Sequence, residues 1–259
     1  MQVMISSKYI PLLSLFSKEV RRFLTVGIQT ILGPAISSLL FLAVFNLALG
    51  RSVETINGIS FANFIAPGLI MMTILQNSFS NAASSIGQAK FQGNIVDILM
   101  SPLSDFELTI GYISGAIVRG LICGIVTFFF IIFFISMSIY SYVALIFYSL
   151  MGSLMMGSVG TMVGIWASKW DQQQGITNFV VLPLTFLSGT FYSIAPLPEF
   201  WKNLAAFNPF FYNIDGFRYA FIGKSDSSLY IGSAFLVLLN VILFFLCYLM
   251  FRSGYKLKS

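Results

Sequence analysis

Long apolar runs separated by short polar stretches are the main pattern along this chain of 259 residues. A helix of about 20 apolar residues is long enough to cross the roughly 30 Å hydrocarbon core of a bilayer. Six runs are close to this length, and they occupy residues 24–49, 61–86, 108–136, 142–167, 176–194 and 229–251. The pattern predicts an all-α polytopic membrane protein with six transmembrane helices.

The segment before the first run, residues 1–23, has the mixed pattern of an amphipathic helix. Its apolar residues recur every three or four positions with charged residues between them, and the two sets are Ile10, Leu13, Phe16 and Val20 against Lys18, Glu19 and Arg22. This spacing predicts an N-terminal interfacial helix along the inner membrane surface. The alternative is a cytoplasmic lead-in whose basic residues only fix the topology.

The segment before the last run, residues 195–228, is aromatic but interrupted by prolines and charges. Two short helices are expected to begin at Pro198 and Pro209, because proline is tolerated in a first helical turn. Non-helical backbone at membrane depth must be buried in protein or line a water-filled cavity. We therefore predict an extracytoplasmic re-entrant segment, in which Asp215 and Arg218 can pair on one helical face. An interfacial belt of Phe, Trp and Tyr is the alternative.

Charge is scarce, and it lies beside the runs. The chain is 57% hydrophobic and 9% charged, whereas soluble domains carry about 25% charged residues. The net charge of +5 comes from basic residues near the ends of apolar runs, which indicates membrane topology and not a nucleic-acid partner. With six crossings, nine Lys and Arg residues fall on the side of the termini and four on the other. Both termini are therefore predicted to be cytoplasmic.

Two runs contain polar residues that need a partner. In the second run, Thr73, Asn77 and Asn81 recur on one helical face, and such a face either lines a substrate path or bonds to a neighbouring helix. Arg119 precedes an uncharged stretch that starts at Gly120 and is long enough to cross by itself. A charge at the bilayer centre costs about 2.5 to 3.5 kcal/mol. Arg119 is therefore expected to anchor the third helix at the cytoplasmic interface rather than to contact a substrate.

The runs give no support to catalytic or ion-coupled functions. They contain no histidine and no carboxylate away from their ends, which counts against a proton-coupled carrier. The sequence offers no nucleophile with a base and no set of metal ligands, so no catalytic residue and no metal site is predicted. If the chain moves a substrate, its energy is expected to come from another chain.

A polar stretch with the sequence DILMSPLSDFE, residues 97–107, lies between the second and third runs on the predicted cytoplasmic side. Around its start the two helical faces differ in character, with Ile95, Ile98 and Leu99 on one face and Asn94 and Asp97 on the other. Pro102 is expected to end this short helix. A short amphipathic helix of this kind suits docking to a partner, and a simple turn without a partner is the alternative.

Four stretches of the chain carry a resemblance to a known family. They are APGLI at 66–70, KFQGNIVDILMSPLS at 90–104, LPLTFLSGTFYSIAPLPEFW at 182–201 and NPFFYNIDGFRYAFIG at 208–223. In this order they resemble the ABC-2-type transport permeases, closest to the YadH-like branch. The resemblance implies a single transmembrane domain over residues 1–259, in the cytoplasmic (inner) membrane, that moves a hydrophobic or amphipathic lipid, glycolipid, polysaccharide or drug out of the cell. A non-pumping membrane scaffold or assembly factor with the same fold is the alternative.

The same resemblance implies partners and site residues. Two copies of a separate ABC ATPase would bind ATP and Mg²⁺, with no cofactor on this chain, and a second permease copy would complete a homodimer among membrane lipids. The expected ATPase contacts come from a coupling loop over residues 87–106 and from the interfacial helix: Asn94, Ile95, Asp97, Ile98, Leu99, Ser101, Pro102, Lys18, Glu19, Arg21 and Arg22. The expected translocation path involves the first, second and fifth crossings and the outer segment: Gln29, Thr73, Asn77, Asn81, Phe191, Tyr192, Tyr212, Asp215 and Arg218.

Overall fold

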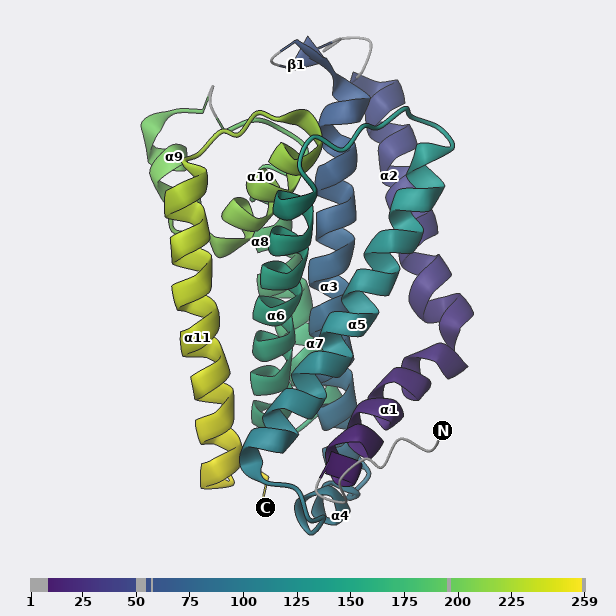
Figure 1. Ribbon diagram of the computed structural model, residues 1–259, viewed down its shortest axis with the longest axis vertical. Helices are drawn as coiled ribbons and strands as arrows, with labels where there is room; N and C mark the ends of the chain where they lie inside the picture. The colour runs from purple at the N-terminus through teal and green to yellow at the C-terminus, as the bar shows by residue number, and fades with distance from the viewer. Residues whose placement is uncertain (1–8, 50–54, 57, 195–196, 258–259) are drawn as a thin grey trace, which may run out of the picture.

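The computed structural model describes residues 9–49, 55–56, 58–194 and 197–257, and in these ranges the chain is a bundle of helices (Figure 1). Four helical stretches there are long and apolar enough to cross a membrane, and they are Ile28–Ala48, Asp105–Ile132, Tyr142–Trp166 and Leu229–Ser253. The predicted all-α membrane fold is confirmed. The second and fifth of the six predicted crossings are not among these four stretches, because the helix of the second is more polar and that of the fifth is interrupted. These two crossings therefore stay predictions.

The amphipathic N-terminal helix is present as α1, Ile10–Thr25, while residues 1–8 of the predicted segment lie outside the described residues. Its buried apolar residues, Leu15 and Phe23, face the bundle. In Figure 1, α1 crosses the lower end of the bundle obliquely and then turns upward. The turn leads into the π-helical η2, Ile28–Leu32, and then α2, Gly33–Leu49. One segment can thus lie along the membrane surface while the next one crosses.

The most polar of the long helices lies at the centre of the bundle. After the antiparallel strands β1, Thr55–Ile56, and β2, Ile59–Ser60, the helix α3 runs over Phe61–Phe91. It is buried along most of its length and lies between the other helices in Figure 1. Polar side chains such as Thr73 and Asn77 are costly in lipid but can bond to neighbouring helices. The pattern of the second run therefore explains its central place.

Glycines allow α5, Asp105–Ile132, and α6, Tyr142–Trp166, to approach α3 closely. A methyl group added at Gly120 of α5 would collide with the Ser78 side chain of α3. One added at Gly160 of α6 would collide with the backbone of α3 at Phe79. Small residues at such crossings are how membrane helices gain van der Waals contact.

A lysine joins the inner ends of α3 and α6. The Lys90 ammonium, one residue before the end of α3, donates hydrogen bonds to the carbonyls of Ile165 and Ala167 at 2.6 and 2.7 Å. These carbonyls belong to the end of α6, where backbone acceptors lack helical partners. The cation also complements the negative end of the helix dipole.

The loop predicted over residues 87–106 is shorter than expected at both ends. Helix α3 continues to Phe91, and α5 already begins at Asp105. The remaining loop contains α4, Ile95–Leu99. Ser104 and Glu107 form a capping box at the start of α5, and acidic residues are favoured in a first helical turn. Two of the acidic residues of this stretch, Asp105 and Glu107, therefore belong to the first turn of α5.

The prediction of one crossing helix over residues 176–194 is wrong at both ends. The helix begins earlier as α7, Trp170–Ile176, continues as the π-helical η3, Thr177–Val181, and ends as α8, Leu182–Phe186. Beyond it the chain makes turns, with Gly189 at a φ of 73°. Hydropathy alone did not reveal this end, because the apolar run continues past the helix.

Two short helices follow near the starts predicted by their prolines. Pro198 is the N-cap of α9, Glu199–Ala206, and Pro209 is the first residue of α10, Pro209–Ile222. Helix α10 is buried in the upper part of the bundle, where Gly216 lies against the Tyr148 ring of α6. How deep this segment lies in a membrane stays a prediction.

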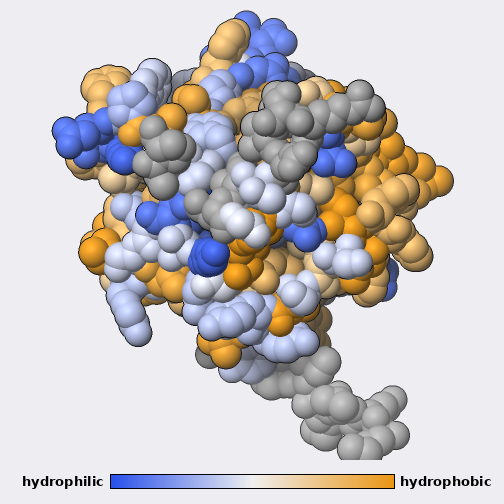
Figure 2. All heavy atoms as spheres, turned by 90° about the horizontal axis from the view of Figure 1, so that it is seen from above, coloured by the Kyte–Doolittle hydropathy of each residue, from blue (hydrophilic) through white to orange (hydrophobic). Residues whose placement is uncertain are grey.

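The last helix, α11, Leu229–Ser253, lies at one edge of the bundle (Figure 1). Large apolar side chains are exposed on α2, α5 and α11, including Val44, Leu47, Phe129, Val241 and Phe245. Figure 2 looks down on the end that carries α9 and shows polar side chains over much of this face, with apolar ones toward its edges. An apolar belt between polar ends is typical of a bundle surrounded by lipid.

Candidate functional site

A cavity of about 370 Å³ lies between α2, α3, α5 and η3. Eight polar side chains line it, and they are Ser37, Ser38, Thr73, Gln76, Asn77, Ser80, Arg119 and Thr177. The rest of the lining is apolar, from Pro34, Phe41, Met72, Phe79, Val181 and Leu182. Two residues predicted for the path, Thr73 and Asn77, therefore lie in one polar cavity whose walls come from the first, second, third and fifth apolar runs.

Arg119 faces this cavity, so its predicted role as an interface anchor is wrong. The side chain is 8% exposed, and its Nη2 donates to Asn77 Oδ1 across 3.3 Å. The physical reason is that Arg119 lies near the middle of α5, on the face that packs against α3. The glycine beside it, Gly120, lets α3 come close enough to supply a polar partner.

Hydrogen bonds hold the walls of the cavity together. The hydroxyls of Ser38 on α2 and Thr73 on α3 are 2.8 Å apart. The Cys123 thiol of α5 donates to the Thr30 carbonyl in the π-helical turn η2 at 3.3 Å. A second π-helical turn, η3, contributes Thr177 and Val181. Such turns widen a helix locally and are frequent at functional sites.

Two other residues predicted for the path lie elsewhere. Gln29 is exposed on η2 and is not among the residues that line the cavity. Asn81 has no exposed surface and accepts a hydrogen bond from Arg22 at its Oδ1, 2.9 Å away. The regular spacing on α3 placed Asn81 on the same face as Asn77, but α1 covers this end of the face.

The charged residues of α1 divide into an inner and an outer pair. Glu19 is fully buried, accepts a hydrogen bond from the Ser85 hydroxyl at 2.7 Å, and lies 3.6 Å from Arg22. Of the four predicted ATPase contacts on this helix, Glu19 and Arg22 therefore bind α3 instead. Lys18 and Arg21 are exposed. The cause is close packing, because the Glu19 side chain lies over Gly115 of α5.

Helix α4 also divides into inner and outer residues. Ile95 is 6% exposed and belongs to the inner apolar cluster that Ile98 and Leu99 join. Ile95 is therefore not available as a surface contact, and its predicted docking role is wrong. Val96 and Met100 are 52% and 80% exposed instead. The exposure of Val96 and Met100 could have been inferred from the sequence, since both are apolar residues on the polar side of a short helix that offers them no apolar neighbour.

The outward residues of α4 and of the turn after it are Val96, Asp97, Met100 and Pro102, and all four are exposed. They lie at the inner end of the bundle, where α4 extends below the other helices in Figure 1. A groove of about 470 Å³ joins α4 to α1 and brings together the predicted contacts Lys18, Asp97, Ile98, Ser101 and Pro102. Asn94, at the N-cap of α4, is exposed as well.

In the outer segment, Asp215 and Arg218 form hydrogen bonds with neighbouring loops and with α3 instead of with each other. Asp215 accepts hydrogen bonds from the amides of Asp226 and Ser227 at 2.9 and 3.0 Å. Arg218 donates to the Phe64 carbonyl at 3.2 Å, and its guanidinium lies 4.0 Å from the centre of the Phe64 ring. Both side chains are almost fully buried. Their predicted pairing is wrong, and they hold the outer loops to the bundle.

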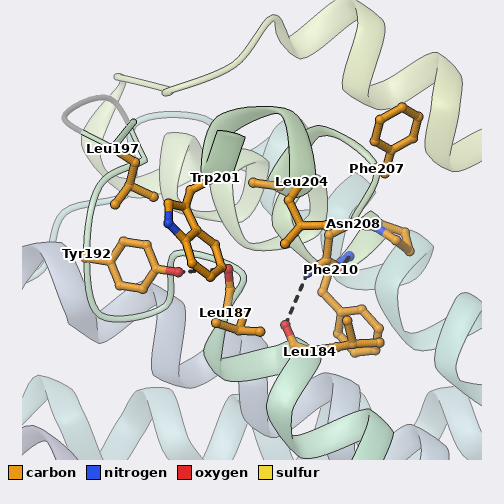
Figure 3. Close-up of a pocket in the computed structure, with 11 residues that line it drawn as sticks. Leu184, Leu187, Tyr192, Leu197, Trp201, Leu204, Phe207, Asn208 and Phe210 are labelled. Carbon is orange, nitrogen blue, oxygen red and sulfur yellow. Dashed lines mark hydrogen bonds between the residues drawn. The ribbon is translucent and has the colours of Figure 1, made fainter. Parts of the chain in front are cut away.

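An apolar pocket of about 340 Å³ opens among α8, α9 and α10. Figure 3 shows Tyr192 and Trp201 side by side on one wall and Leu184, Leu187 and Leu204 around it. The Tyr192 hydroxyl donates to the Leu187 carbonyl at 2.9 Å.

The remaining path predictions lie beside this pocket. Phe191 stacks on Phe45 of α2, with ring centres 4.4 Å apart. Tyr212 donates to the Ala206 carbonyl at 3.0 Å. Neither Phe191 nor Tyr212 is among the residues that line the polar cavity beside Arg119.

A polar cavity inside an apolar helical bundle, with an exposed helix at one end, is the architecture of a membrane transport subunit. The chain belongs to the ABC-2 type transporter family, whose model matches residues 11–222. It is 34% identical over 251 residues to the inner membrane transport permease YadH of Escherichia coli K12, covering 97% of this chain and 98% of that protein. It is 24% identical over 217 residues to nodulation protein J of Rhizobium leguminosarum bv. viciae, covering 80% and 81%. The chain is therefore a multi-pass transporter permease, and the resemblance found in the sequence is confirmed.

Proposed function

We propose that this chain is the inner-membrane subunit of an ATP-driven exporter for a hydrophobic or amphipathic substrate. Two copies of the chain pair, and two separate ATPase subunits bind the face that carries α4 and supply ATP and Mg²⁺ from their own sites. This face and both termini are cytoplasmic in the proposal, in agreement with the excess of basic residues on that side. The family supports the ATPase partner, because its members belong to ABC transporter systems.

The observation that carries the proposal is the division of α4 into an anchored and an exposed face. Ile95 is buried in the inner apolar cluster, while Asp97 and Met100 point outward. A partner bound to Asp97 and Met100 would therefore move the inner apolar cluster together with the loop that carries α4. ATP-driven approach of two ATPases would then shift two permease bundles as rigid bodies.

The two cavities support the substrate class. The polar cavity beside Arg119 can hold a head group, and the apolar pocket beside Trp201 can hold hydrocarbon. Loops that close the outer end are held by the buried contacts of Arg218. In the proposal, the substrate leaves the bundle past these loops.

The test begins with the full chain, purified from its native membrane together with the ATPase that accompanies it. In proteoliposomes, Asp97→Lys and Met100→Glu are expected to lower permease-dependent ATP turnover about tenfold, as the loss of a central interface contact does. Glu199→Lys is the matched control, because it makes the same charge change at an exposed position on α9 at the opposite end. If the Asp97→Lys complex hydrolyses ATP like the wild type, coupling through α4 is excluded, and the scaffold alternative is favoured.

A further inference from the structure

The polar cavity contains hydrogen-bond donors that lack acceptors. Arg119 Nε and Gln76 Nε2 are both buried, and neither has a partner among the described residues. Both residues line the cavity. A buried donor without an acceptor is costly and is rare in folded proteins. The arrangement is explained if a ligand supplies the missing acceptors.

The cavity also contains a charge that has no counterion among the described residues that line it. Of the fourteen residues that line it, Arg119 is the only ionisable one. In the described part of the chain, Arg119 donates a hydrogen bond to a neutral amide, Asn77 Oδ1. The buried carboxylate of Glu19 is bound to Ser85, Lys18 and Arg22 instead. A buried cation is expensive unless an anion compensates it.

The neutral donors in the wall are of the kind that bind anions. Ser37 and Ser80 line the cavity with hydroxyls. The Thr177 hydroxyl already donates to the Gln173 carbonyl at 3.0 Å, and the Ser38 hydroxyl lies 2.8 Å from that of Thr73. Guanidinium, amide and hydroxyl groups together satisfy the several lone pairs of a phosphate or carboxylate. A neutral sugar would bring acceptors as well, but it would leave the charge of Arg119 uncompensated.

We propose that the cavity between α2, α3, α5 and η3 binds the anionic head group, phosphate or carboxylate, of an amphipathic substrate. Arg119 supplies the charge, and Gln76 supplies an unpaired amide donor. The inference rests on the proposed transport function and gives the substrate a charge that neither the fold nor the relatives specify.

The experiment measures head-group preference on the full chain in neutral detergent micelles. Native mass spectrometry counts the molecules of dioleoyl phosphatidylglycerol or dioleoyl phosphatidylcholine that remain bound during a titration. The wild type is expected to bind the anionic lipid at least about tenfold more tightly, which corresponds to one charge-assisted hydrogen bond. Arg119→Gln is expected to abolish this preference, and Arg119→Lys to keep most of it.

Two further variants make the result specific. Gln76→Leu removes the unpaired amide without changing the charge and is expected to lower the preference about threefold. Arg252→Gln is the matched control, because it removes the same charge from an exposed site at the end of α11. It is expected to leave the preference unchanged. If Arg119→Gln does not fold, the Gln76→Leu titration decides the matter alone.

Inorganic phosphate distinguishes the two sources of the anion. Displacement of phosphatidylglycerol by millimolar phosphate assigns the site to the phosphate group alone, and resistance assigns it to the whole lipid. Equal binding of both lipids to the wild type, or an unchanged preference in both Arg119→Gln and Gln76→Leu, would overturn the proposal. Because the titration needs no ATPase, a failure here leaves the coupling through Asp97 standing, and a failure of coupling leaves the head-group result readable.

Discussion

Two arginines are buried in the part of the bundle that the structure describes, and their surroundings differ. At the outer end, Arg218 is 3% exposed and donates to the carbonyls of Phe64, Gly189 and Thr190. In the middle, Arg119 is 8% exposed and donates to one amide beside an open cavity. The first cation is enclosed by backbone acceptors and serves the fold. The second is left with free capacity, which is what a binding site requires.

The largest expected effect comes from Arg218. Replacing it with Leu should lower the free energy of unfolding by about 3 to 5 kcal/mol, because several buried carbonyls lose their donor. Arg218→Lys should recover only part of this loss, since one ammonium group cannot reproduce the planar fork. Denaturant unfolding of the purified protein in detergent measures both variants. A loss below about 1 kcal/mol for Arg218→Leu would show that the outer end does not depend on this residue.

A smaller effect is expected from disturbing the contact between α6 and α3. Helix α3 serves both arginines, because it supplies the Phe64 carbonyl to Arg218 and the Asn77 amide to Arg119. Gly160→Ala should destabilise the bundle by about 1 to 3 kcal/mol, since the new methyl group meets the α3 backbone. Gly175→Ala is the control, because no atom lies within 4 Å of its added carbon. Equal unfolding curves for the two variants would mean that α3 is not held by this close contact.

The smallest effect on stability is expected at Arg119. Arg119→Met removes one long hydrogen bond but also removes an uncompensated buried charge, so the free energy of unfolding should change by less than about 1 kcal/mol. The measurement is the one used for Arg218→Leu, carried out on the protein without added anionic lipid. A loss as large as that of Arg218→Leu would remove the contrast between the two arginines and assign Arg119 to the fold.

Much of the fold could be predicted from the sequence. Run length and hydropathy located the long helices, and Pro198 and Pro209 marked the starts of α9 and α10 within one residue. The amphipathic spacing of α1 was equally clear. The end of the fifth predicted crossing, at α8, could not be predicted, because the apolar run passes through the turn at Gly189 without a change in hydropathy.

The candidate site was harder to predict, because its residues depend on contacts between distant helices. Counting uncharged residues from Gly120 placed Arg119 at the membrane surface, but the count does not show that α3 offers Asn77 opposite it. A usable signal was present nonetheless. Arg119 shares a helical face with Ala116 and Cys123, both fully buried, and small residues on one face indicate a neighbouring helix.

The hydrogen bonds of Lys90 have a mechanical consequence. They fasten the last carbonyls of α6 to the end of α3, four residues before α4 begins at Ile95. If a partner pulls on α4, as proposed, only a short loop can stretch before the movement reaches the joined ends of α3 and α6. In the Lys90→Met variant the ends of α3 and α6 would lose this link, and bending of the loop would absorb part of any movement of α4.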